Sequence, residues 1–184
     1  MQYSEKTVLK NGKICEIRNA EGIDGDAVYN VFISTHSETD FLLSYPDENS
    51  LTPEQESEFL DKQSKSDNSI ELCAVIDGVI AGTAGINPLG TKYKVQHRAE
   101  FGIGILKEYW GMGIGKALTA ACISCAEKAG YTQLELEVVA DNERAIQLYS
   151  GLGFREYGRN PYGFRSRFSG MQELVLMRLI LNNR

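Results

Sequence analysis

The chain has 184 residues, of which 42% are hydrophobic and 24% charged, a composition that is typical of a globular protein with one sizeable core. Its formal net charge of −6 argues against a nucleic-acid-binding domain, because such domains are usually basic. The length suits one domain, and we expect residues 1–184 to form it.

Neither a signal peptide nor a membrane span is predicted. The N-terminus has no apolar run behind its charges, and the apolar stretch 174–181 is short and contains Arg178. Cys122 and Cys125 form a C-x-x-C pair, but they lie in the middle of a predicted helix and no second pair exists to complete a zinc site. We therefore expect them to pack in the core as reduced thiols, and we expect a cytoplasmic protein without a membrane partner.

The first half of the chain carries two hairpin signals and two helix signals. Asn-Gly at 11–12 and Asp-Gly at 77–78 are typical of type I′ hairpin turns. Apolar residues have helical spacing over 23–36, and the segment 52–55 combines an N-cap threonine, a proline at N1 and a capping-box glutamine, which predicts a helix to about residue 65. The hairpins predict strands over 7–10, 13–18, 70–76 and 79–86.

The second half alternates strands with helices. A strand over 99–106 is followed by a helix over 114–129, which has a clean apolar stripe and Gly130 as its C-cap. Further strands are predicted over 134–140, 154–157 and 173–180, and a short helix over 142–150. This order predicts an α/β (α+β) fold with a central mixed, mostly antiparallel sheet flanked by helices.

Between the strand 99–106 and the next helix lies a glycine-rich turn. Its glycines are Gly111, Gly113 and Gly115. They free backbone N–H groups to converge on one point at a helix N-terminus, which makes an anion site of the pyrophosphate kind. A P-loop is excluded, because Trp110 and Ala117 stand where it needs glycine and Ser/Thr. A dinucleotide fingerprint is excluded because Lys116 replaces its third glycine.

The turn fits a third pattern, Gln/Arg-x-x-Gly-x-Gly/Ala, with Trp110 in place of the first residue. Here the chain resembles the GNAT superfamily of N-acetyltransferases, in which this loop binds the pyrophosphate of acetyl-CoA. The segment from Asn142 to Phe154 matches the second GNAT signature, Asn-x-x-Ala-x-x-Leu-Tyr-x-x-x-Gly-Phe, at every stated position. The two motifs span residues 100–154, and the N-terminal third matches only in its order of elements.

The resemblance implies acetyl-CoA as co-substrate and no metal. The residues that we expect to bind it are Ile103, Gly104, Ile105, Trp110, Gly111, Met112, Gly113, Ile114, Gly115, Lys116, Asn142 and Tyr149. Gly102 and Gly104 share one face of their strand, where their missing side chains leave space for a pantetheine arm. Backbone N–H groups near residues 103–105 are expected to polarise the acetyl carbonyl.

Three side chains are candidates for proton transfer. The resemblance assigns Tyr149 to the leaving thiolate, as a general acid. A base must take a proton from the acceptor, because primary amines have a pKa near 10.4 and are mostly protonated at neutral pH. Glu137, at the place where the ribosomal-protein N-terminal acetyltransferases have a proposed base, and Glu100, on the glycine-bearing face of its strand, are nearly equal candidates. For each glutamate, a structural role as the ion-pair partner of an arginine explains the residue as well as a role as the base does.

The acceptor stays open between a small amine and a peptide N-terminus. The segment 158–170, expected to be a loop, carries Arg159, Arg165 and Arg167 among aromatic residues. It could clamp a carboxylate or phosphate, form a solvated hairpin, or pair with acidic residues at a homodimer contact. A polyamine or peptide N-terminus could instead meet Glu38, Asp40, Asp47 and Glu48. An alternative for the whole chain is a silent GNAT-like sensor or scaffold that binds acyl-CoA; the intact Tyr149 and glycine turn favour the enzyme.

Overall fold

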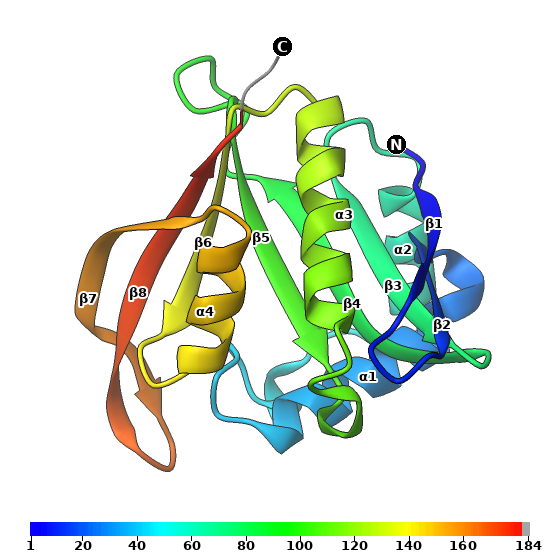
Figure 1. Cartoon of the computed structure of the whole chain (residues 1–184), viewed down its shortest axis with the longest axis horizontal. Coiled ribbons are helices and arrows are strands. Elements are labelled where there is room, and N and C mark those ends of the chain that lie inside the picture. Colours follow the sequence, from blue (N-terminus) through cyan, green and yellow to red (C-terminus); the bar gives the residue numbers. More distant parts are fainter. Residues whose placement is uncertain (182–184) are drawn as a thin grey trace.

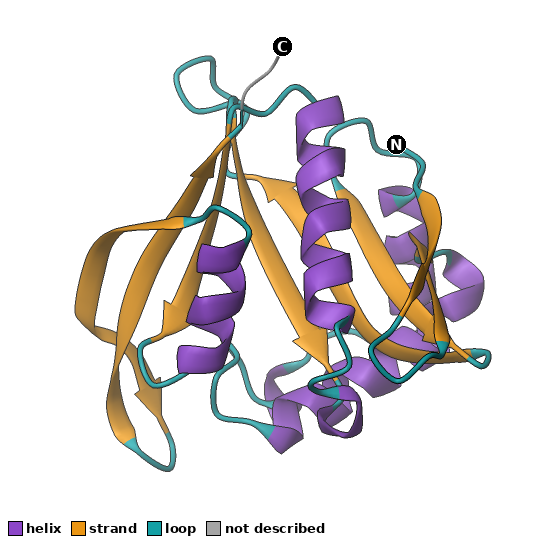
Figure 2. Ribbon diagram, in the orientation of Figure 1, coloured by secondary structure: helices purple, strands orange, loops and turns teal. Residues whose placement is uncertain are grey.

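One twisted sheet runs through the chain, with helices on both of its faces, in a computed structural model that describes residues 1–181 (Figure 1; Figure 2). The strands are β1 Ser4–Val8, β2 Ile14–Asn19, β3 Ile70–Ile76, β4 Val79–Pro88, β5 Arg98–Ile105, β6 Gln133–Val139, β7 Arg155–Ser166 and β8 Gly170–Ile180. The α-helices are α1 Gly25–Glu38, α2 Pro53–Gln63, α3 Ile114–Lys128 and α4 Glu143–Gly151.

The eight strands described follow the order β1-β2-β3-β4-β5-β6-β8-β7, and β5 and β6 are the parallel neighbours among them. All other neighbouring pairs are antiparallel. The predicted mixed, mostly antiparallel sheet is therefore confirmed. Both expected hairpins form, and the second turns at Asp77 and Gly78, which have positive φ angles of 51° and 80°.

The parallel pair β5–β6 is short. It joins Arg98–Glu100 to Gln133–Glu135 only, although β5 continues to Ile105 and β6 to Val139. Beyond the paired residues the two strands diverge, and α4 lies over the opening (Figure 1). The backbone of β5 that faces this splay has no strand partner, which leaves its polar groups available to a ligand.

The larger core lies between the sheet and α3. Ile114, Leu118, Cys122 and Cys125 are buried on the sheet-facing side of α3, and Gly130 follows it with a positive φ of 83°. Both cysteines are fully buried free thiols, and burial raises the pKa of Cys122 well above its usual range. The prediction that this C-x-x-C pair packs in the core is confirmed.

Helices α1 and α2 cover the opposite face over a smaller core that contains Val28, Leu60 and Cys73. The predicted start of α2 is confirmed. The side-chain oxygen of Thr52 accepts a hydrogen bond from the Gln55 N–H at 3.3 Å, and Gln55 Oε1 accepts one from the Thr52 N–H at 2.9 Å. This reciprocal cap satisfies two N–H groups that the first turn of a helix leaves without partners.

The segment 158–170 differs from the expected loop. Most of it is strand β7, which pairs with β8 up to Ser166 opposite Gly170, with register shifts between Glu156 and Gly158 and between Asn160 and Phe164. Turn-forming residues suggested a loop, but β7 is an edge strand, and edge strands tolerate proline and bulges. Pro161 lies within the second irregular stretch, where no ladder hydrogen bond is needed from it.

Candidate functional site

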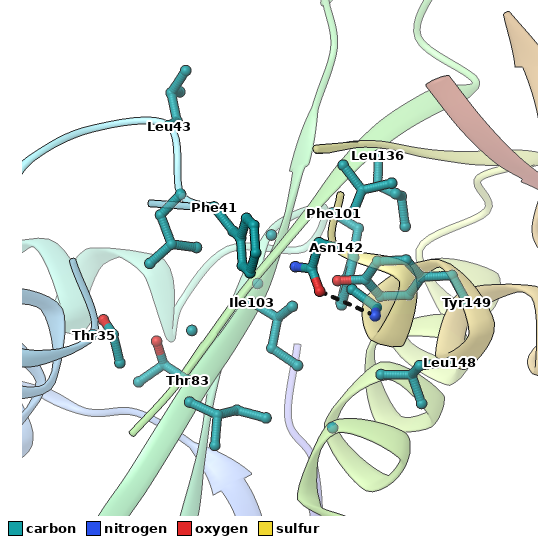
Figure 3. Close-up of a pocket in the computed structure, with 18 of the residues that line it drawn as sticks. Thr35, Phe41, Leu43, Thr83, Phe101, Ile103, Leu136, Asn142, Leu148 and Tyr149 are labelled. Carbon is teal, nitrogen blue, oxygen red and sulfur yellow. Dashed lines mark hydrogen bonds between the residues drawn. The ribbon is translucent and has the colours of Figure 1, made fainter. Parts of the chain in front are cut away.

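A cavity of about 950 Å³ lies at the splay of β5 and β6. The glycine turn and α4 line one part of it, while α1, the segment 39–43 that follows it, and α2 line the other. Figure 3 shows Ile103 of β5 between these parts, with Thr35, Phe41 and Leu43 on one side and Asn142, Leu148 and Tyr149 on the other. The cavity therefore has two walls of different origin that meet along β5.

The glycine turn needs its glycines for two reasons. Gly111 and Gly113 have positive φ angles of 87° and 103°, in the left-handed region that side chains disfavour, and Gly113 is the N-cap of α3. At Gly115 a Cβ atom would lie 3.1 Å from Leu148 Cδ2 of α4, so this glycine permits close packing of the two helices. The turn thus presents the N–H groups of the first turn of α3 toward the cavity, as an anion site requires.

Three cations line this end of the cavity: Lys10, Lys116 and Arg144. The Arg144 guanidinium lies 5.4 Å from the centre of the Trp110 ring, and Trp110 Nε1 donates to the Ile105 carbonyl oxygen at 2.7 Å. The Lys10 N–H donates to the Met112 carbonyl oxygen at 3.1 Å, which ties the β1–β2 turn to the glycine turn. Helix N-terminus and cations together suit the pyrophosphate of a coenzyme A ester.

Most of the predicted cofactor-binding residues line the cavity: Ile103, Gly104, Ile105, Trp110, Gly111, Gly113, Ile114, Gly115, Lys116, Asn142 and Tyr149. Met112 is outside its wall and contacts the β1–β2 turn instead, through its carbonyl and through a 3.5 Å contact between its sulfur and Asn11 Nδ2. Sequence reasoning missed Lys10 and Arg144. Arg144 lies within the second motif, at a position that the motif leaves open, so its place near the cofactor could have been predicted. Lys10 comes from a hairpin that is distant in sequence, and nothing in the sequence pointed to it.

Asn142 and Tyr149 both line the cavity, from the start and from the second turn of α4 on the same side of β5 (Figure 3). Asn142 is the N-cap of α4, and its Oδ1 accepts a hydrogen bond from the Ala145 N–H at 3.2 Å, so its amide group remains able to donate to a ligand. Tyr149 is only 7% exposed, with its ring edge-on to Phe101 and tilted against Phe154 at centroid distances of 6.0 and 5.9 Å.

The Tyr149 hydroxyl is suited to donate a proton. Burial raises the pKa of Tyr149, so the phenol stays protonated at neutral pH. Every fully buried side-chain nitrogen or oxygen in residues 1–181 has a hydrogen-bond partner, yet no hydrogen bond is made by this hydroxyl. The hydroxyl is therefore not sealed in the core but reaches the cavity that Tyr149 lines.

The two predicted base candidates both line the cavity, Glu100 from β5 and Glu137 from β6. Both residues are exposed, and within residues 1–181 neither carboxylate takes part in a hydrogen bond or ion pair. A third carboxylate of the cavity wall, Glu135, is instead bound by Arg98 through two hydrogen bonds. This pairing holds the pKa of Glu135 low, so Glu135 is a fixed structural carboxylate while Glu100 and Glu137 stay free.

The face of β5 with Gly102 and Gly104 is turned toward α1. A Cβ atom on Gly104 would lie 3.3 Å from Thr35 Oγ1, so at this residue the space that we expected for pantetheine is taken up by α1. A Cβ on Gly102 would meet nothing within 4 Å, so Gly102 opens to the cavity. The opposite face packs toward the core, with Ile105 Cδ1 3.5 Å from a Cβ placed on Gly115.

The arginines of segment 158–170 do not line the cavity. Arg159 binds Glu156 and Glu173, while Arg167 binds Asp47 and stacks on the Tyr45 ring at 4.2 Å. Of the three alternatives for this segment, an anion clamp finds no support in the cavity wall. These arginine–carboxylate pairs form within one chain rather than across a dimer contact.

The acidic residues expected to receive an amine also have partners within the chain. Asp40 accepts hydrogen bonds from Ser166, Ser169 and Tyr45. Glu38 accepts one from the Lys107 N–H at 2.7 Å. Asp47 and Glu48 pair with Arg167. Asp40, Asp47 and Glu48 hold the loop after α1 against β7, β8 and the turn between them, while Glu38 binds the segment after β5. All four are thus engaged within the chain, which does not favour the alternative that they receive the amine.

Besides Glu135, two further carboxylates that sequence reasoning missed line the cavity, Glu56 of α2 and Glu71 of β3. Both are half-buried, and burial raises the pKa of both groups, that of Glu71 to about 7. A charged residue that faces inward from a buried strand was the signal for Glu71. For Glu56, the residue pattern of the helix did not indicate that its side chain faces the cavity.

Within residues 1–181, no helix has the length and apolarity that crossing a bilayer would require. The same residues bring together no group of three or more His, Cys, Asp or Glu side chains that could hold a metal ion.

Comparisons of the sequence point to acetyltransferases. The sequence model of the Acetyltransferase (GNAT) family matches residues 30–154. The ribosomal protein bS18-alanine N-acetyltransferase of Escherichia coli (strain K12) is 38% identical over 81 residues, 43% of this chain and 53% of that protein. A mycothiol acetyltransferase of Renibacterium salmoninarum is 39% identical over 77 residues, 42% of this chain and 20% of that protein. The matches thus span about half or less of these curated relatives.

Comparisons of the structure agree. An acetyltransferase of the GNAT family from Streptococcus pneumoniae superposes with a TM-score of 0.86 and 32% identity, over 91% of this chain and 99% of that one. The fold is shared with yncA, described as a putative acetyltransferase from Salmonella typhimurium with its cofactor acetyl-CoA, at a TM-score of 0.81, 18% identity and 92% and 95% coverage. With a family match over most of its length and this fold, the chain belongs to the GNAT family of acetyltransferases.

Proposed function

We propose that this protein transfers the acetyl group of acetyl-CoA to a primary amine, on a small molecule or a peptide N-terminus, without a metal. The observation that carries the proposal is the splay of β5 and β6, which brings the glycine turn and the Tyr149 hydroxyl to one cavity. The free, buried cysteines of residues 1–181 support a reducing, cytoplasmic location.

The residues at the α3 end of the cavity fit acetyl-CoA. N–H groups of residues 113–116 and the cations Lys10, Lys116 and Arg144 would hold its phosphates. The open backbone edge of β5 and the Asn142 amide would hold its pantetheine amides, much as an added strand is held. When bound, acetyl-CoA supplies an acetyl group activated as a thioester.

The chain's own side chains move the protons. Glu137, or Glu100 as the second candidate, takes the proton that an ammonium group must lose before its nitrogen can attack. Tyr149 donates to the departing sulfur, and its raised pKa keeps the phenol in the protonated, donor form at neutral pH. The alternative of a silent acyl-CoA sensor has no observation in its favour, since both carboxylates and the Tyr149 hydroxyl are free to react.

The test is calorimetry of acetyl-CoA binding to the parent and to Gly113→Asp. We expect binding to be abolished, because aspartate places a carboxylate and a side chain where the phosphates would lie and strains a backbone with a φ of 103°. Gly78→Asp is the matched control, since Gly78 has a φ of 80° with open space around it in the β3–β4 turn. Unchanged affinity in Gly113→Asp, or binding of ATP or NAD instead of acetyl-CoA, contradicts the proposal.

A further inference from the structure

The part of the cavity that faces α1 and α2 has an apolar wall. It is formed by Phe32 of α1, Phe41 and Leu43 of the segment after α1, Phe59 of α2, and Leu89 after β4. Leu43, Phe59 and Leu89 are 82%, 42% and 41% exposed, so large apolar groups face the opening rather than the core. Figure 3 shows Phe41 and Leu43 on this side of β5. Exposed apolar side chains gathered at a cavity indicate an apolar ligand.

Carboxylates lie among these apolar groups, from Glu56, Glu71, Glu100 and Glu137. Glu71 is opposite Gly85 in the β3–β4 ladder, and a Cβ atom at Gly85 would overlap the Glu71 carboxyl group. The missing side chain of Gly85 therefore lets this carboxyl lie across β4 inside the cavity. The Thr83 side chain hydrogen-bonds to it, and Glu56 faces it from α2 closely enough to repel its charge.

No cation in the described wall balances these carboxylates. Its lysines and arginine, Lys10, Lys116 and Arg144, belong to the glycine-turn end. The remaining basic candidate, His36, stacks on Phe32 at 3.7 Å between ring centres, and burial lowers the pKa of His36, so the ring is neutral at neutral pH. Of the four, Glu56 and Glu71 are half-buried. Half-buried carboxylates without a cation are unfavourable, and a cationic ligand would relieve that cost.

We propose that the acceptor is a small amine cation with an apolar, aromatic-sized body and no anionic group, and that Glu71 is the specificity-determining residue that attracts its ammonium group. This inference rests on the proposed function and identifies its substrate class. The apolar wall receives the body of the amine, while acceptors that carry a carboxylate or phosphate meet only like charge on this side of β5.

The first arm of the test compares two acceptors that differ by one carboxylate, 2-phenylethylamine and phenylalanine, by thiol release with acetyl-CoA. We expect kcat/KM to be at least about 100-fold higher for 2-phenylethylamine, since like-charge juxtaposition in a desolvated site is strongly unfavourable. 1,4-Diaminobutane, which has the charge without the apolar body, should be at least about tenfold poorer than 2-phenylethylamine.

The second arm uses Glu71→Gln, which keeps the shape of the side chain and removes its charge. We expect KM for 2-phenylethylamine to rise about tenfold or more, as for loss of a charge-assisted hydrogen bond, with kcat and the KM for acetyl-CoA nearly unchanged. An unchanged acetyl-CoA affinity by calorimetry shows that the variant is folded. Glu58→Gln, an exposed position of α2 outside the cavity wall, is the matched control and should behave as the parent.

The outcomes separate this inference from the proposed function. One result that overturns the inference is acetylation of amines with equal kcat/KM for phenylalanine and 2-phenylethylamine. Another is an unchanged KM for 2-phenylethylamine in Glu71→Gln. After either result the proposed function stands. A phenylalanine-headed peptide that is acetylated more efficiently than 2-phenylethylamine also overturns it, in favour of a peptide N-terminus. If acetyl-CoA binds but no amine is acetylated, the proposed function itself fails.

Discussion

Tyr149 stays in its protonated, donor form because of its neighbours. Phe101 of β5 and Phe154 pack against its ring and exclude water from it, and this burial raises the pKa of Tyr149. Its hydroxyl nevertheless lies at the wall of the cavity. The phenol is therefore in its donor form when the thiolate leaves, and it can stabilise the developing charge on sulfur by donating a hydrogen bond or the proton itself.

We expect Tyr149→Phe to lower the rate of acetyl transfer by roughly 10²–10⁴-fold, as for loss of a general acid, and to leave acetyl-CoA affinity nearly unchanged. The measurement is steady-state thiol release, with calorimetry for the affinity. Tyr162→Phe, on an exposed residue of β7 outside the cavity wall, is the control and should match the parent. A fully active Tyr149→Phe variant would mean that water protonates the sulfur.

The two free carboxylates of the cavity can be separated in the same way. We expect Glu137→Gln to lose more than tenfold in rate, about 1.4 kcal/mol in barrier, because glutamine keeps the shape and loses the basicity. Glu100→Gln should lose less. The reverse order identifies Glu100 as the base. If neither variant is slower, the site selects amines that are already neutral and works by positioning.

At the scale of the element, the N-terminus of α3 depends on parts of the chain that are far apart in sequence. The glycine turn supplies N–H groups, the β1–β2 turn supplies Lys10, and α4 supplies Arg144. Stacking on Trp110 holds the Arg144 guanidinium beside the turn, where a Cβ atom on Gly111 would lie 3.6 Å from its Nη2. The motif therefore accounts for only part of the anion site, and the remaining charge comes from tertiary structure.

We expect Arg144→Gln to weaken acetyl-CoA binding about tenfold, or about 1.4 kcal/mol, because one charged contact to the phosphates is lost. The difference from the parent should shrink in high salt, since screening weakens an exposed contact. Calorimetry at two salt concentrations measures both effects. Arg155→Gln, exposed on β7 away from the cavity, controls for net charge; an equal effect in both variants would rule out a local role for Arg144.

Local sequence signals predicted the elements wherever one residue pattern decides the structure. The capping box at Thr52, the turn at 77–78 and the apolar stripe of α3 are of this kind, and so is the second motif with Asn142 and Tyr149. The start of β7 was predicted, but its continuation beyond Tyr157 was missed, because glycine, asparagine and proline in an edge strand look like a loop. Glu71 was missed because its importance comes from Gly85 on the neighbouring strand, which only the register reveals.

At the scale of the whole molecule, the cavity makes stability depend on pH. Burial, with repulsion from Glu56 and against a hydrogen bond from Thr83, raises the pKa of Glu71 to about 7 from the usual 4.5. Between these two values the unfolded chain releases this proton while the folded protein retains it. The free energy of unfolding therefore falls as pH rises through this window, by about 1.4 kcal/mol for each pH unit at most.

We expect Glu71→Gln to remove this term. The difference in free energy of unfolding, variant minus parent, should increase by on the order of 1–3 kcal/mol from pH 5 to pH 8, because only the parent loses stability as this carboxyl ionises. Urea unfolding at the two pH values measures the difference, in which contributions from His36 and other groups common to both proteins cancel. Glu58→Gln is the control. A difference between Glu71→Gln and the parent that is the same at both pH values would show that the Glu71 carboxyl does not titrate abnormally.

The splay of β5 and β6 also bears on how the protein opens. Within the sheet, strands β6, β8 and β7 are joined to the other five by only three residue pairs, beside which lie the Arg98–Glu135 ion pair and the contacts of Phe101 with Tyr149 and Phe154. The loop after α1 adds hydrogen bonds to Ser166 and Arg167 outside the sheet. Parts of a sheet that share so short a ladder can unfold locally with different free energies, which amide hydrogen exchange resolves. A ligand seated between β5 and β6 would bridge the two parts and make their exchange protection rise together. The co-substrate would then stabilise the sheet across this gap for as long as it is bound.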